Sequence, residues 1–188
     1  MKKVVRMWIG IGLGGLVGLV VFVVIVGLCL PESYRAKGRL DVGLPPEAVW
    51  KLISDFEAHP ISANMARSVE ALPDVDGLPS WNEDIGSTVI TVTTVEEVAP
   101  QRLVRRMTDR IVPMTATWSF RIEPLDSGSR IWVENQTEIR RGTWHVPIFR
   151  LMMTMTRGAE KGVEAYLKQL GGELSGTPVQ WERTESQP

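Results

Sequence analysis

The sequence predicts an α+β domain preceded by one membrane-spanning helix, and three observations carry this prediction. An apolar run without a charged residue occupies residues 7–30. Segments that alternate between polar and apolar side chains fill much of residues 35–139. A run with helical periodicity then extends from Pro147 to Leu170. A sheet followed by an amphipathic helix buries both apolar faces when the two pack as layers, which defines the α+β class.

The composition excludes several classes of function. The chain has 188 residues, a formal net charge of -1, one cysteine and two histidines. This length suits one compact domain with an appendage. One cysteine excludes a disulfide framework and a cysteine-cluster metal site, and two histidines leave little for a histidine-rich centre. Nucleic-acid-binding domains usually carry a basic excess, which is missing here. We therefore expect no metal, no cofactor and no nucleic-acid partner.

Residues 7–30 are long enough to cross a bilayer core, which needs about 20 apolar residues. A short basic tail, residues 1–6, precedes them. A cleavable signal peptide is the alternative, but its apolar region is typically about 7–15 residues long and ends in small residues. Cys29 suggests a lipoprotein, yet the bulky Leu28 occupies the position where a lipidation signal requires a small residue. We predict an uncleaved single-pass anchor.

The orientation and the oligomeric state are less strongly indicated. Basic residues flank the apolar run on both sides, so the positive-inside rule gives almost no preference. The short tail is easily retained inside, and we favour an extracytoplasmic domain. Gly10, Gly14 and Gly18 lie on one helix stripe, which permits close helix approach and is compatible with a homodimer. Glycine is also common in membrane helices, so composition alone explains the same pattern.

The domain is predicted to span residues 32–174, beginning with a strand at residues 35–42. This segment alternates strictly, which predicts a half-buried strand. Pro45 and Pro46 then open a helix, because proline is favoured in the first helical turn. The apolar stripe of this helix comprises Val49, Trp50 and Ile53.

Further strands are expected where β-branched residues or alternation dominate. They are residues 67–72, 87–98, 103–107, 115–122 and 130–139. Residues 73–82 contain two prolines and are interpreted as a loop. One apolar face is expected to carry Trp118, Phe120 and Ile122, and another Ile131, Val133, Asn135, Thr137 and Ile139.

The C-terminal part has helical periodicity. Apolar side chains recur every three or four residues at Ile148, Met152, Met155, Ala159, Val163, Tyr166 and Leu170. We predict one continuous helix of about 24 residues from this spacing. Gly171 and Gly172 are expected to end it. Residues 175–188 are polar and are interpreted as a flexible tail.

Four segments, in this order, are similar to the START/Bet v 1-like superfamily, which includes polyketide cyclase/dehydrase and lipid-transport proteins of the SRPBCC type. They are LPPEAVWKLISDFEAHP, EVAPQRLVRRMTD, TATWSFRIEPLDSGSRIWVENQTEI and FRLMMTMTRGAEKGVEAYLKQL. The resemblance covers residues 34–174. Many members have a tryptophan shortly after the position of Pro60, where this chain has Ile-Ser-Ala-Asn at residues 61–64. The resemblance implies a helix-grip fold, in which a curved antiparallel sheet wraps around the C-terminal helix and encloses a cavity for hydrophobic molecules.

The candidate ligand-pocket residues combine apolar, small and two polar side chains. They are Met107, Trp118, Phe120, Val133, Asn135, Thr137, Met152, Met155, Gly158, Ala159 and Gly162. Flexible methionines suit an adaptable pocket, although they also fill ordinary cores. Asn135 and Thr137 are expected either to orient a ligand or to bond to the backbone or to water.

The sequence favours a membrane-anchored binding module for a hydrophobic small molecule or lipid. One alternative is a cyclase/dehydratase-type enzyme acting on a polyketide-like or other apolar substrate. A second is a scaffold domain whose cavity is filled by its own side chains. Asp55 and His59 are spaced as an acid–base pair, but no nucleophile stands beside them, so catalytic residues remain unassigned. Arg105, Asp109, Arg121 and Glu134 are interpreted as members of surface ion pairs.

Overall fold

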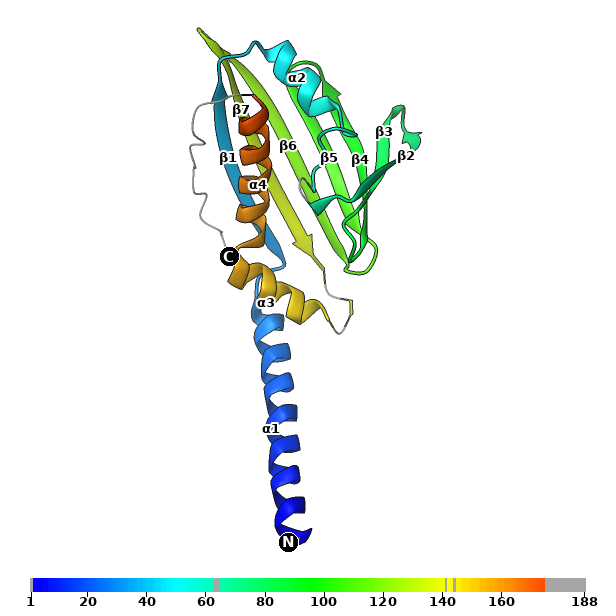
Figure 1. Ribbon diagram of the computed structural model, residues 1–188, viewed down its shortest axis with the longest axis vertical. Helices are drawn as coiled ribbons and strands as arrows, with labels where there is room; N and C mark the ends of the chain where they lie inside the picture. The colour runs from blue at the N-terminus through cyan, green and yellow to red at the C-terminus, as the bar shows by residue number, and fades with distance from the viewer. Residues whose placement is uncertain (1, 63–64, 141, 144, 175–188) are drawn as a thin grey trace.

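The computed structural model describes residues 2–62, 65–140, 142–143 and 145–174, with side chains from Gly12 onward. The predicted tail, residues 175–188, lies outside the described residues. An N-terminal helix, α1 (Lys2–Cys29), extends away from a domain built on one antiparallel sheet (Figure 1). Three helices complete the domain: α2 (Pro46–Ser54), α3 (Val146–Thr156) and α4 (Gly158–Glu173).

Helix α1 contains a window, Gly12–Cys29, that is long and apolar enough to span a membrane. Its large apolar side chains are exposed on several sides, with Leu13 and Phe22 each 63% exposed. A helix that is apolar all round needs an apolar environment. The dimer prediction for Gly10, Gly14 and Gly18 stays a prediction.

The sheet has seven strands in the order β1-β7-β6-β5-β4-β3-β2. The strands are β1 (Ser33–Val42), β2 (Ser68–Val75), β3 (Leu78–Asp84), β4 (Val89–Val98), β5 (Arg102–Asp109), β6 (Met114–Leu125) and β7 (Gly128–Ile139). Each described pair is antiparallel. Consecutive strands from β2 to β7 are neighbours, and β1 lies beside β7 as one edge of the sheet. The predicted α+β class is confirmed.

Alternation in the sequence correctly predicted which residues of β1, β6 and β7 face the core. The strand β1 buries Ala36, Gly38, Leu40 and Val42. Strands β6 and β7 form a long hairpin whose inward residues are buried in the same alternating manner. Successive side chains of a strand point to opposite faces, so a single period-2 pattern fixes which residues face the core.

The interpretation of residues 73–82 as a loop is wrong, because β2 and β3 form a hairpin there. Asp76 and Gly77 have φ values of 53° and 76°, and they make the two-residue turn. Positive φ at both central positions is typical of the type I′ turn, for which Asp-Gly is a strong signal. Pro73 lies where the β2–β3 register shifts, on the edge strand, and such positions tolerate proline.

The prediction of one continuous C-terminal helix is also wrong. Arg157 adopts the left-handed conformation, with φ 52° and ψ 51°, and it separates α3 from α4. Gly171 and Gly172 lie inside α4 and do not end it. Helix α4 packs on β1 and β7, whereas α3 packs on α1 across the end of the sheet (Figure 1).

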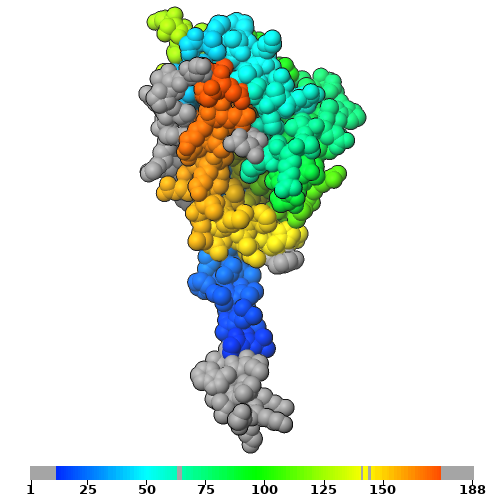
Figure 2. Space-filling model, viewed as in Figure 1, coloured from blue at the N-terminus to red at the C-terminus, as the bar shows by residue number. Residues whose placement is uncertain are grey.

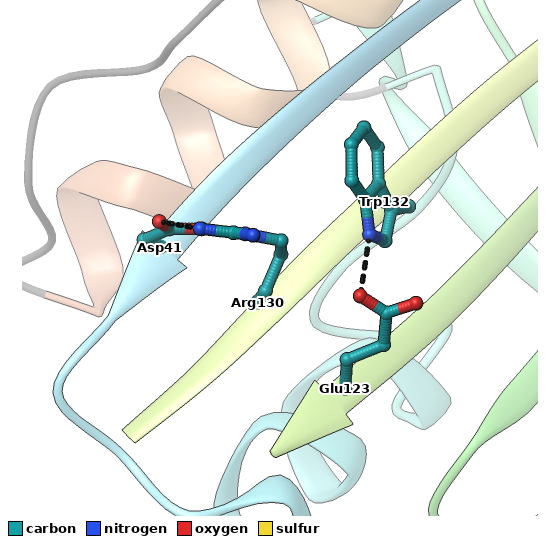
Figure 3. Close-up of polar contacts among 4 residues, drawn as sticks. All are labelled: Asp41, Glu123, Arg130 and Trp132. Carbon is teal, nitrogen blue, oxygen red and sulfur yellow. Dashed lines mark hydrogen bonds and ion pairs between the residues drawn. The ribbon is translucent and has the colours of Figure 1, made fainter. Parts of the chain in front are cut away.

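Side chains on the opposite face of the sheet join β1, β7 and β6 (Figure 3). The Arg130 guanidinium donates from Nε and Nη2 to the two carboxylate oxygens of Asp41, each at 2.7 Å. This contact lowers the pKa of Asp41 below its usual value. Trp132 Nε1 donates to Glu123 Oε2 at 2.9 Å.

Candidate functional site

A cavity of about 470 Å³ lies between the inner face of the sheet, α3 and the first two turns of α4. The sheet contributes Ile90, Met107, Ala116, Trp118, Asn135 and Thr137. The helices contribute Phe149, Met152, Met153, Gly158, Ala159, Gly162 and Ala165. Loops and strand ends contribute Ile61, Ser62, Met65, Ile85, Ser87, Thr88, Asp109, Ile111, Val112 and Met114. Small-molecule pockets usually have volumes of roughly 300–1,000 Å³.

Most of the candidate pocket residues meet at this cavity. Those that line it are Met107, Trp118, Asn135, Thr137, Met152, Gly158, Ala159 and Gly162. Phe120 and Val133 are 1% and 0% exposed and belong to the core beyond the cavity. Met155 is 76% exposed, because the break at Arg157 rotates it away from the α4 stripe to which its spacing assigned it.

The glycine at position 162 leaves space in front of an aromatic wall. A Cβ at Gly162 would lie 3.7 Å from the Trp118 ring, which is an ordinary contact distance. Trp118 in turn packs against Tyr166, with ring centroids 5.9 Å apart. A larger side chain at position 162 would therefore extend past Trp118 into the cavity.

Two buried polar side chains stand in the otherwise apolar wall. Asn135 and Thr137 are 2% and 4% exposed, and Thr137 Oγ1 donates to Asn135 Oδ1 at 2.8 Å. This bond uses the Asn135 carbonyl oxygen and leaves its amide nitrogen as a donor group. A few fixed polar groups in an apolar pocket can set the orientation of a ligand.

Asp109 is the ionisable side chain among the described lining residues. Its Oδ1 atom accepts hydrogen bonds from the backbone N–H groups of Ile111 and Val112, at 2.6 and 2.9 Å. Thr88 Oγ1 also donates to it, at 3.4 Å. The carboxylate thereby orders the loop between β5 and β6, and Asp109 is not the surface ion-pair member that its sequence position suggested.

Glu83, which the sequence reasoning missed, holds another part of the cavity wall. Its side chain is 0% exposed and accepts from the backbone N–H groups of Ile61 and Ser62, at 2.9 and 2.8 Å. Trp81 Nε1 donates to the same carboxylate at 2.8 Å. Glu83 therefore fixes the segment after α2 at the point where Ile61 and Ser62 reach the cavity. The Asp76-Gly77 turn was the signal that could have placed Glu83 on a strand.

Arg105 is buried, so its interpretation as a surface ion-pair member is wrong. It is 1% exposed, and its guanidinium lies 4.8 Å from the Trp81 ring centroid. Its Nη2 atom donates to the Ser54 carbonyl oxygen at 3.3 Å. Burial lowers the pKa of Arg105, and burial raises the pKa of the nearby Tyr166 to about 12. Both groups belong to the core beyond the cavity lining.

The spacing of Asp55 and His59 does not produce an acid–base pair. Asp55 Oδ1 accepts from the Ala58 N–H group at 3.1 Å, as a helix-end residue does. His59 Nδ1 lies 2.9 Å from Glu173 Oε2, at the end of α4. His145 Nε2 lies 3.2 Å from the Ile111 carbonyl oxygen and connects the start of α3 to the β5–β6 loop.

No protein-family model matches the sequence, and the search of curated proteins also finds no match. Solved structures do match. The Zhui aromatase/cyclase from Streptomyces sp. R1128 superposes with a TM-score of 0.59 at 18% identity, covering 76% of this chain and 94% of that one. A START superfamily protein from Mycobacterium smegmatis superposes with a TM-score of 0.54 at 17% identity, covering 75% of this chain and 97% of that one. The Mll3558 protein from Rhizobium loti superposes with a TM-score of 0.54 at 19% identity, covering 76% of this chain and 97% of that one.

The chain therefore has the START/Bet v 1-like fold, and the sequence resemblance is confirmed at that level. Strands β1 to β7 form the antiparallel sheet of this fold, and α3 and α4 form its C-terminal helical layer, which is divided at Arg157. At these identities the similarity establishes the fold and leaves the ligand and the chemistry to be argued from the cavity.

Proposed function

We propose that this chain is a single-pass membrane protein whose domain binds a hydrophobic small molecule or lipid taken from its own bilayer. The observation that carries the proposal is the apolar cavity of about 470 Å³ between the sheet, α3 and α4. Its volume supports binding over the scaffold alternative, which requires a filled interior. The N-terminal tail of six residues is easily retained inside, which favours an extracytoplasmic domain.

The lining suits an amphiphile that is mostly apolar. Each CH₂ group buried in such a cavity contributes roughly 0.8 kcal/mol to binding. The Asn135 amide, fixed by Thr137, would hold one hydrogen-bond acceptor of the ligand at the sheet wall. The ligand class is therefore a molecule with one long apolar part and one acceptor group.

The short link between helix and sheet supports capture from the same membrane. Helix α1 ends at Cys29 and β1 begins at Ser33. The three residues between them span at most about 11 Å when fully extended. A domain so close to the bilayer exchanges ligand with that bilayer more readily than with a distant one.

A cyclase-type enzyme acting on a similar ligand is the second candidate. The structural similarity to an aromatase/cyclase favours it. The Asp109 carboxylate, however, already accepts three hydrogen bonds through Oδ1, which fits a structural role at the cavity wall better than proton transfer. Binding without reaction accounts for the described lining more simply.

Gly162→Leu is expected to weaken the binding of an apolar fluorescent probe about tenfold or more, since it occupies space worth two or more CH₂ groups of ligand. Gly172→Leu is the matched control, because it lies on the same helix with nothing within 4 Å of its Cβ position. Probe titration of the full chain in detergent micelles measures both affinities. Equal affinities for the two variants would contradict the proposed site.

A further inference from the structure

Part of the cavity lining, including Ile111 and Met152, lies at the end of the sheet that adjoins α1. The strand β1 begins at Ser33, which pairs with Glu138 of β7. The next residue of β7, Ile139, pairs with Met114 at the start of β6. The β5–β6 loop, with Ile111, is therefore level with the end of α1. Figure 2 shows α3 covering this base of the domain beside α1.

Helix α3 is fixed to the junction between α1 and the sheet. Gly27 of α1 packs so closely against the backbone of Pro147 that no Cβ would fit there. The Arg150 guanidinium is fully buried; its Nε and Nη2 atoms donate to the Ile139 carbonyl oxygen at 3.2 and 2.7 Å. Its Nη2 atom also lies 3.1 Å from Glu32 Oε1, in the link after α1. These contacts hold α3 against both α1 and the end of β7.

The outward face of α3 is apolar. Ile148, Met152 and Met155 are 45%, 47% and 76% exposed, and they follow one another at helical spacing. The only charged residue of α3 is Arg150, whose side chain points inward. Ile111 of the neighbouring loop is 57% exposed. A surface of this kind on a soluble protein marks an interaction with a protein or a membrane.

We propose that α3 lies in the interfacial layer of the bilayer that α1 crosses, with Ile148, Met152, Met155 and Ile111 inserted among the lipids. This inference rests on the proposed membrane anchor. The contact with α1 favours lipid as the occupant, because a surface held beside a membrane-spanning helix meets lipid before any other partner. Interfacial helices bury their apolar face about 5–10 Å deep at the headgroup boundary. Met152 and Ile111 also line the cavity, so this part of its wall would be in contact with lipid.

The test uses the full chain in phosphatidylcholine vesicles and a single fluorescent label. Cys29 is the one native cysteine, and Cys29→Ser provides a background without it. Met155→Cys places the label on the outward face of α3. Ser127→Cys places it on the exposed β6–β7 turn at the far end of the sheet, as the control. Flotation of the vesicles, followed by an alkaline wash, shows first whether the protein is membrane-anchored.

In washed vesicles that retain the protein, lipids brominated near the glycerol end are expected to quench most of the fluorescence at position 155. The label at position 127 should keep its fluorescence. Equal weak quenching at both positions would overturn the inference while leaving the anchor intact. A label at position 155 that is shielded from water but not quenched by lipid would assign the face to a protein partner, which also overturns it. Loss of the protein from the vesicles would instead contradict the proposed anchor.

Discussion

Glu83→Ala is expected to lower the free energy of unfolding by about 3–5 kcal/mol, because it leaves three buried N–H donors without an acceptor. The donors are the backbone N–H groups of Ile61 and Ser62 and the indole of Trp81. The segment carrying Ile61 and Ser62 should detach from the sheet, so probe binding should weaken together with stability. Denaturant unfolding of the full chain in detergent micelles measures the change.

Glu123→Ala is the matched control for this variant. Glu123 also accepts a bond from a tryptophan, Trp132, but its side chain is 41% exposed. Exposed polar contacts of this kind contribute about 1 kcal/mol or less. If Glu83→Ala were no more destabilising than Glu123→Ala, the buried carboxylate would not have the structural role assigned to it.

Arg150→Ala should be destabilising to a similar degree, by about 3 kcal/mol, and its effect should be concentrated in α3. The change removes both donors from the buried Ile139 carbonyl oxygen and leaves a space where the side chain lay. It also removes the contact with Glu32 in the link after α1. Hydrogen exchange should therefore accelerate in α3 more than in the β6–β7 hairpin.

Arg157→Ala is the control for position 150. Arg157 lies between α3 and α4, and its exposed guanidinium contacts Glu160 at 3.8 Å. Removal of that contact should change stability by less than about 1 kcal/mol. Uniform acceleration of exchange across the domain in Arg150→Ala would mean that Arg150 supports the whole core and does not specifically hold α3.

The strands of the sheet were predictable because their information is local. In β1, β6 and β7 every second residue faces the core, so alternation alone identified the buried positions. The β2–β3 hairpin was missed because Pro73 and Pro79 suggested a loop, although the Asp76-Gly77 dipeptide carried the opposite signal. Proline at an edge-strand bulge is compatible with pairing, and only the sheet order reveals that β2 is an edge.

The break at Arg157 could not be predicted from periodicity. The apolar spacing continues across it, and the left-handed conformation costs a non-glycine residue about 1–2 kcal/mol. Packing offsets this cost. Helix α4 packs along the sheet while α3 packs on α1, and one straight helix could not make both contacts. This is why Met155 matched the spacing of the cavity residues but lies outside the cavity.

The buried charged residues were missed for a related reason. Glu83, Arg105 and Arg150 are of residue types that are almost never fully buried unless they are paired. Their partners come from distant segments: Ile61 for Glu83, Ser54 for Arg105 and Ile139 for Arg150. Such pairs form only after the layers assemble, so the sequence pattern favours the surface for each of them.

Ligand uptake from two vesicle populations tests the central claim most directly. The full chain is reconstituted in one population, and a fluorescent single-chain amphiphile is placed either in those vesicles or in separate protein-free ones. Direct capture predicts faster acquisition from the protein's own vesicles, and slow acquisition by Gly162→Leu in both arrangements. Equal rates for the unmodified chain from the two populations would show that the ligand arrives through water and would contradict capture from the bilayer.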